Sequence, residues 1–207
     1  MGKMNLLKAN WEGKVGQTVG AKWKDKSTIR TYSKPSNPNT QAQQDVRGAF
    51  KAITSFTALF SDQIRYLSAL PTAGMSVRNA IVKLNKEMIA NNNFTKADLL
   101  ISKGGLQKVS GEAGTASAGK VTITWDEPTA TNFTAAAKLV VVMVQESSGL
   151  VEVATADAKA TTRSIESSIT FDTASGADDV DVYVYFLDKR GSNKVASASD
   201  YLKVTIA

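Results

Sequence analysis

The chain has 207 residues, of which 25 are Lys or Arg and 19 are Asp or Glu, and it contains no His and no Cys. These absences exclude nucleophilic sites that pair Ser or Cys with His, disulfides, and zinc or iron–sulfur sites ligated by Cys and His. We therefore expect a protein that is not an enzyme, with no catalytic residue, no cofactor and no metal.

Charge is distributed unevenly along the chain. Residues 1–105 carry 16 Lys and Arg against six Asp and Glu, whereas residues 106–207 carry nine against 13. This asymmetry indicates contacts with nucleic acid or a membrane, polar self-association, or two ordinary domains of different charge. Charges interrupt the first residues, so we expect no signal peptide, and the longest apolar stretch, residues 139–144, is too short to span a membrane.

Residues 11–32 predict a β-hairpin that turns near Asp25 and Lys26. Its arms carry more apolar and aromatic side chains than an isolated hairpin can leave in water, so we expect it to contact another chain. The alternative is that it packs on the helices that follow. The candidate interface residues are Trp11, Val15, Val19, Trp23, Ile29, Arg30, Tyr32 and Arg47.

Residues 40–67 and 76–89 space their apolar residues three and four positions apart, which is typical of one face of a helix. Thr40 and Ser76 are the expected N-caps. The short connection predicts an antiparallel helix pair, which we expect to pack on the hairpin or on another subunit. Arg47, Arg65 and Arg78, on or beside these helices, are expected to form surface or interface ion pairs.

The remaining residues predict a small-residue linker followed by an all-β region. Short strands are expected around residues 99–102 and 106–107, and the stretch 106–120 is rich in Gly, Ser and Ala. Short segments separated by turn residues then predict a sandwich with strands at 121–125, 138–145, 150–154, 165–171, 180–187 and 195–206. Asp178, Asp179 and Asp181 are interpreted as a solvated turn, with a Ca²⁺ site as the alternative.

The predicted fold class is α+β, with a β-hairpin and a helix pair followed by an immunoglobulin-like β-sandwich. The predicted domains are a basic assembly domain at residues 1–105, a linker at 106–120 and the sandwich at 121–207. Trp125, near the end of an early strand and followed by Pro128, is similar to the pattern of fibronectin type III and immunoglobulin-like domains.

The N-terminal half contains W-x-G-K-V-G-x-x-V-G at residues 11–20, W-K-x-K at 23–26, I-R at 29–30 and N-P-x-T-x-x-Q-x-x-x-R-x-x-F at 37–50. In these motifs it resembles a group of uncharacterised proteins of Bacteroidetes and their phages. The resemblance carries no activity or catalytic residue. It implies a virion or envelope-associated structural protein that pairs an assembly domain with an immunoglobulin-like domain.

We therefore expect a structural protein of a bacteriophage particle that assembles in the bacterial host cytoplasm and acts through protein–protein contacts. Its expected partners are other virion proteins and further copies of itself. One alternative is a surface-displayed binding or adhesion module that uses the sandwich. A second is nucleic-acid binding by the basic N-terminal half, in which Lys and Arg lie among aromatic residues.

Overall fold

The computed structural model describes residues 12–23, 26–34, 36–70, 74–173, 179–190 and 193–206. The chain divides after Thr40 into two compact units. This division differs from the predicted boundaries at residues 105 and 120, because the helices pack in the same unit as the C-terminal strands. None of the helices in the described ranges is long and apolar enough to cross a membrane.

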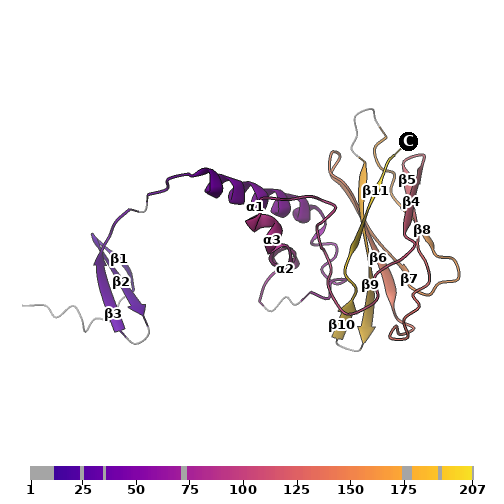
Figure 1. Ribbon diagram of the computed structural model, residues 1–207, viewed down its shortest axis with the longest axis horizontal. Helices are drawn as coiled ribbons and strands as arrows, with labels where there is room; N and C mark the ends of the chain where they lie inside the picture. The colour runs from indigo at the N-terminus through magenta and orange to yellow at the C-terminus, as the bar shows by residue number, and fades with distance from the viewer. Residues whose placement is uncertain are drawn as a thin grey trace, which may run out of the picture. The chain divides into compact units, whose positions relative to one another are not determined.

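The first unit is built on an antiparallel sheet, which we call the N-terminal sheet. In spatial order its strands are β1 (Gly13–Val15), β2 (Thr18–Trp23) and β3 (Lys26–Thr31) (Figure 1). The predicted hairpin corresponds to β2 and β3, and β1 is an additional strand that the sequence pattern did not indicate. Gly16 and Gln17 form a two-residue turn before β2, and the φ of +57° at Gly16 favours glycine there.

The second unit has three layers, which are helices, a five-stranded sheet and a three-stranded sheet (Figure 1). The helices are α1 (Gln41–Phe60), α2 (Val77–Leu84) and α3 (Lys86–Ala90). The large sheet contains β6 (Lys138–Gln145), β7 (Leu150–Asp157), β9 (Val180–Arg190), β10 (Asn193–Ala196) and β11 (Asp200–Val204). The small sheet contains β4 (Ala113–Ser117), β5 (Lys120–Thr124) and β8 (Ser164–Glu166). A mixture of helices and antiparallel sheets is thus confirmed.

The central strands β6 and β9 are buried on both faces. Side chains alternate along a strand, so Val140 and Tyr183 face the helices whereas Val141 and Val182 face the small sheet. This double burial explains the uninterrupted apolar run in β6.

The helices cover one face of the large sheet within their own unit, a contact that the sequence pattern did not indicate. α1 ends at Phe60, earlier than the predicted residue 67. The second predicted helix is broken at Asn85, whose side-chain amide donates to the carbonyl of Leu100 at 2.8 Å and accepts from its N–H at 2.9 Å. Ser76 caps α2 as predicted, since its Oγ accepts a hydrogen bond from the N–H of Asn79.

The predicted linker is part of the folded unit. Leu106 and Val109 are buried in the core between the sheets, and β4 lies within the stretch that composition marks as flexible. Residues 99–102 and 106–107 form no strand. They are held beside the break between β10 and β11, where the N–H of Leu106 donates to the carbonyl of Ala196.

Two predicted strands are shorter than expected. The expected strand at 195–206 is split between β10 and β11, because Ser197 leaves the ladder and bonds the backbone of Phe186 with both its N–H and its Oγ. The expected strand at 165–171 is reduced to the three residues of β8. Beyond β8, the N–H groups of Ser167 and Phe171 each donate one backbone hydrogen bond without extending the strand.

The acidic cluster is not the predicted solvated turn. Asp181 is only 3% exposed and lies in β9, and Asp179 forms an ion pair of 2.6 Å with Lys203. Asp178 lies outside the described residues.

We expect the second unit to lose stability in alkali. Burial raises the pKa of the Tyr183, Tyr185 and Tyr201 hydroxyls, and a hydrogen bond to Asp181 raises that of Tyr201 further. Phenols in the unfolded chain ionise near pH 10 while these stay protonated, so the folded state binds more protons and stability falls as the pH rises above about 10. Urea midpoints at about pH 8 and pH 11 test this, and Tyr201→Phe should reduce the difference. An unchanged midpoint would contradict the expectation.

Candidate assembly interface

The register of the N-terminal sheet sorts its side chains onto two opposite faces. Directly paired residues share a face and neighbours along a strand alternate. Lys14, Val19 and Arg30 form one cross-strand row, and Val15, Thr18 and Thr31 form a row on the other face.

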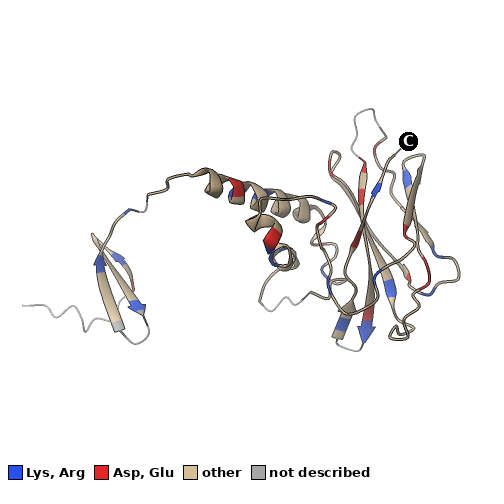
Figure 2. Ribbon diagram, viewed as in Figure 1, with Lys and Arg blue, Asp and Glu red and all other residues tan. Residues whose placement is uncertain are grey.

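The first face combines cations with an aromatic ring. Lys14 Nζ lies 3.7 Å from the centroid of the Tyr32 ring, and the Tyr32 N–H donates to the carbonyl of Gln17 at 2.7 Å. Arg30 is exposed in the same row as Lys14. Figure 2 shows Lys and Arg on the strands of this sheet. The face can therefore contact a partner that is acidic, aromatic or both.

The second face is more apolar. Val15 is 65% exposed, and Ile29, half-buried, lies in a row with Gly13 and Gly20. Among the residues of the N-terminal sheet whose exposure the structure describes, only Gly20, which has no side chain, is buried. Small sheets gain their stability from a second layer packed on a hydrophobic face.

The outer edge of β3 is a further contact surface. β1 and β3 end the strand order, and none of the described strands pairs with the outer side of either; β3 is the longer of these two edges. An edge of this length exposes backbone N–H and carbonyl groups that can pair with a strand from another chain.

The structure separates the candidate interface residues. Val19, Arg30 and Tyr32 share one face of the N-terminal sheet, whereas Val15 and Ile29 lie on the other, so one flat partner surface does not contact all of them. Three candidates belong to neither group. Trp11 is not among the described residues, and Trp23 is the last residue of β2. Arg47 is exposed on α1, in the second unit.

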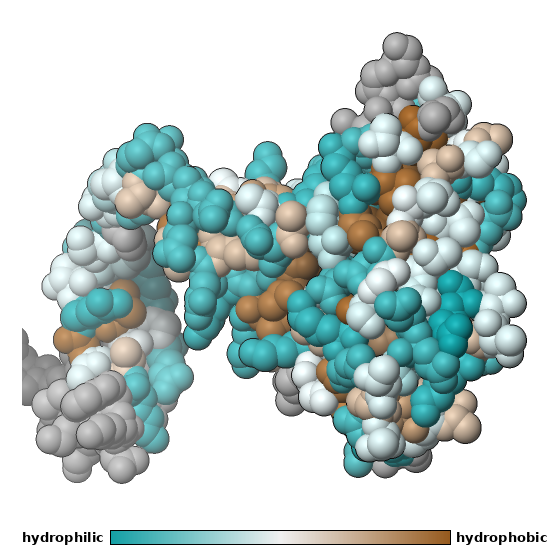
Figure 3. Space-filling model, turned by 45° about the vertical axis from the view of Figure 1, so that its right-hand side comes forward, coloured by the Kyte–Doolittle hydropathy of each residue, from teal (hydrophilic) through white to brown (hydrophobic). Residues whose placement is uncertain are grey.

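Exposed apolar side chains also occur outside the predicted interface. Apart from Val15 and Tyr32, the large hydrophobic residues exposed within the described ranges are Val46, Phe50 and Tyr66. Val46 and Phe50 lie one turn apart on α1, a spacing that could have indicated an uncovered stripe. The face of the molecule in Figure 3 is otherwise mostly hydrophilic, with apolar residues in small patches.

Comparison with known proteins gives a family but no activity. Residues 9–203 match a family of unknown function (DUF6266). No curated protein matches the chain. Among solved structures, a family 76 glycoside hydrolase from a bovine Bacteroides thetaiotaomicron strain is similar with a TM-score of 0.33 and 10% sequence identity. That similarity covers 48% of this chain and only 20% of the hydrolase.

Proposed function

This chain belongs to the family of unknown function DUF6266, and we propose that it is a non-enzymatic assembly protein that docks onto partner chains through its N-terminal sheet. The observation that carries the proposal is that none of the described side chains of this sheet is buried, while the outer edges of β1 and β3 pair with none of the described strands. A partner that covers a face or extends the edge would supply the missing layer.

We further propose that the partners are virion proteins and other copies of this chain. In this proposal the N-terminal sheet makes the contact, and the second unit is the folded part that it attaches to the assembly. The resemblance of residues 11–50 to proteins of Bacteroidetes and their phages supports a place in a bacteriophage particle. The two antiparallel sheets that pack face to face around a shared core support an immunoglobulin-like body. The buried Trp125, whose Nε1 donates to the carbonyl of Ala158 at 3.3 Å, supports the same assignment.

Replacing Val15 by aspartate tests the proposal in the full chain. Val15 is 65% exposed, so the change should leave the fold intact while placing a charge on the docking face. We expect the assembled fraction to fall severalfold, because interface anchors typically contribute about 2 kcal/mol. Size-exclusion chromatography with light scattering, alone and with candidate virion proteins, measures it.

Val46→Asp is the matched control, because Val46 is 44% exposed but lies on α1. Deleting residues 2–34 should give a folded protein that no longer assembles, since the second unit has its own core. Two results would refute the proposal. One is assembly lost in Val46→Asp but kept in Val15→Asp, and the other is a deleted protein that still assembles.

Nucleic-acid binding is the second candidate function, and the shared face of Lys14, Arg30 and Tyr32 favours it. It requires that the full chain retard single-stranded DNA at low salt and that replacing both cations with glutamine remove the retardation. Val15→Asp, on the opposite face, would then leave binding almost unchanged.

A further inference from the structure

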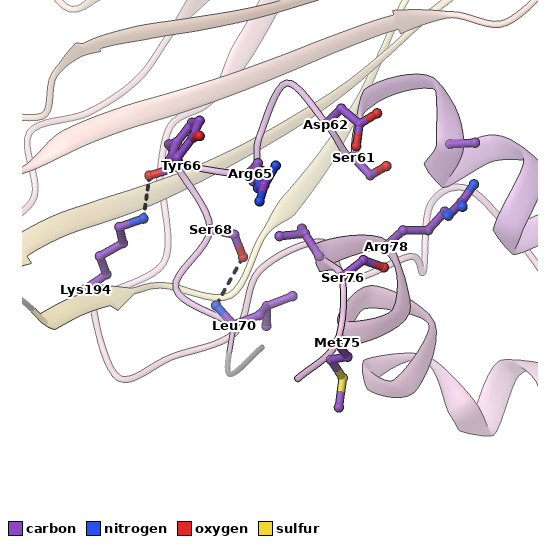
Figure 4. A pocket seen from close by; sticks show the side chains of 12 residues that line it. Ser61, Asp62, Arg65, Tyr66, Ser68, Leu70, Met75, Ser76, Arg78 and Lys194 are labelled. Carbon is purple, nitrogen blue, oxygen red and sulfur yellow. Dashed lines mark hydrogen bonds between the residues drawn. The ribbon is translucent and has the colours of Figure 1, made fainter. Parts of the chain in front are cut away.

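The second unit contains a cavity of about 510 Å³ that is separate from the N-terminal sheet. It lies between the turns that follow α1, the first turn of α2 and Lys194 of β10 (Figure 4). The volume is that of a site for a small molecule. Lys194 Nζ donates to the carbonyl of Tyr66 at 2.6 Å, which fastens the post-α1 turns to the sheet at this wall.

The cavity wall carries more positive than negative charge. Arg65, Arg78 and Lys194 line it, against the single carboxylate of Asp62. Within the described residues no carboxylate lies within ion-pair distance of Arg65 or Arg78, so the predicted surface ion pairs are not formed there. The Arg65 guanidinium lies over the Tyr66 ring, 5.8 Å from its centroid, and with no carboxylate partner in the described ranges both guanidinium groups can bind an anion.

Unused hydrogen-bond donors line the same cavity. The α2 helix begins here, and the N–H groups of Val77 and Arg78 have no hydrogen-bond partner in the part of the chain that the structure describes. The N–H of Asn79 is already capped by Ser76. The N-terminal end of a helix attracts anions through such N–H groups and through the helix dipole.

A largely buried serine points independently to a ligand. Ser61 is only 6% exposed and lines the cavity, yet its Oγ has no hydrogen-bond partner among the described residues. Figure 4 shows it beside the Asp62 carboxylate. Ser68, 9% exposed, accepts from the N–H of Leu70 at 3.1 Å and keeps its own hydrogen free to donate. The Ser61 Oγ is not a fully buried atom, so it is open to the cavity, where an acceptor on a ligand can pair with it.

We propose that this cavity binds the phosphate group of a small phosphate monoester. Two guanidinium groups, two helix N–H groups and two hydroxyls are all donors, and together they suit the three terminal oxygens of a phosphate. The cavity also leaves room for an organic group, and the Tyr66 ring, 76% exposed at its wall, offers that group an aromatic surface.

Nuclear magnetic resonance of the full-length protein tests the site, with inorganic phosphate and ribose 5-phosphate as ligands and ribose as the uncharged control. We expect saturable movement of the Val77 and Arg78 amide resonances with both phosphates and none with ribose. Arg65→Gln and Arg78→Gln should each weaken binding by about tenfold, the loss of one charge-assisted hydrogen bond. Ser61→Ala should weaken it without changing the charge.

Two further variants separate a site from general charge effects. Lys83→Gln removes a cation from the last turn of the same helix, outside the cavity, and should leave the affinity unchanged. Asp62→Asn removes the carboxylate that repels the ligand and should tighten binding. The proposal is overturned if phosphate causes no saturable movement, if Lys83→Gln weakens binding as much as Arg65→Gln, or if ribose moves the same resonances.

Discussion

Replacing Phe56 with alanine is expected to lower the free energy of unfolding of the second unit by about 3–5 kcal/mol. Phe56 is 2% exposed and lies where α1 meets the large sheet. Its ring centroid is 5.7 Å from that of Phe60, 6.2 Å from that of Tyr183 and 6.4 Å from that of Phe94. The truncation therefore leaves a cavity among aromatic rings that belong to both layers.

Urea denaturation followed by circular dichroism measures the loss, and Phe50→Ala is the matched control. Phe50 lies on the same helix but is 50% exposed, so we expect a change below about 1 kcal/mol there. Because helices and sheets share one unit, Phe56→Ala should shift the signals of both in a single transition. Helices that melt alone, with the sheets unaffected, would restore the predicted boundary at residue 105.

The strand pattern predicted the central sheet well, but it did not indicate that the helices cover one of its faces. Residues 138–145 and 180–187 both read as strands, and β6 and β9 begin at the predicted residues. The apolar residues of β6 are consecutive, so they point to both faces of the sheet. Each face of the sheet must therefore be covered by another layer. That requirement was visible in the sequence, whereas the choice of α1 as the cover depends on contacts between segments far apart in the chain.

The prediction from composition was wrong for residues 106–120, which it marked as a flexible linker. β4 consists of small residues, and Gly114 lies so close to Val204 that a Cβ would overlap that side chain. Gly104 similarly has no room for a Cβ beside the carbonyl of Ala196. Small residues that allow close packing have the same composition as a flexible segment, so composition alone does not distinguish them.

The candidate interface could be predicted in part. Alternation along the two predicted arms places Val15 and Tyr32 in the sheet, and the observed register then assigns them to opposite faces. The cavity was not predictable, because Arg65, Arg78 and Lys194 come together only through the packing of α2 and β10 around the turns after α1.

The largest electrostatic effect is expected where the segment after α3 meets the large sheet. Lys96 Nζ lies 2.8 Å from Asp181 Oδ2 and 2.7 Å from Glu146 Oε2, and the Tyr201 hydroxyl donates to Asp181 Oδ1 at 2.7 Å. The Tyr183 hydroxyl donates to the Lys96 carbonyl at 2.9 Å. Burial alone would lower the pKa of Lys96, but its bonds to Asp181 and Glu146 outweigh this and raise it.

Lys96→Met should destabilise the second unit by about 3 kcal/mol, because it leaves the Asp181 carboxylate buried without its cation. The Asp181 side chain is only 4% exposed, and Tyr201 alone does not balance its charge. Asp181→Asn should cost less, because Lys96 is 30% exposed and keeps Glu146. A lysine whose pKa is raised on folding stabilises the protein fully at pH values below the ordinary lysine pKa of about 10, and this stabilisation is lost as the pH rises through the raised pKa. The penalty of Lys96→Met should therefore shrink in stronger alkali.

A double-mutant cycle isolates the pair. The combined Lys96→Met and Asp181→Asn variant should be more stable than the sum of the two single losses predicts, with a coupling of at least about 1 kcal/mol. Lys203→Met is the control, since Lys203 is 61% exposed and its partner Asp179 is 25% exposed, so its effect should be much smaller. If the two single losses simply add, the ion pair contributes nothing beyond its separate side chains, and the contact between residue 96 and β9 is held by apolar packing and the Tyr183 hydrogen bond instead.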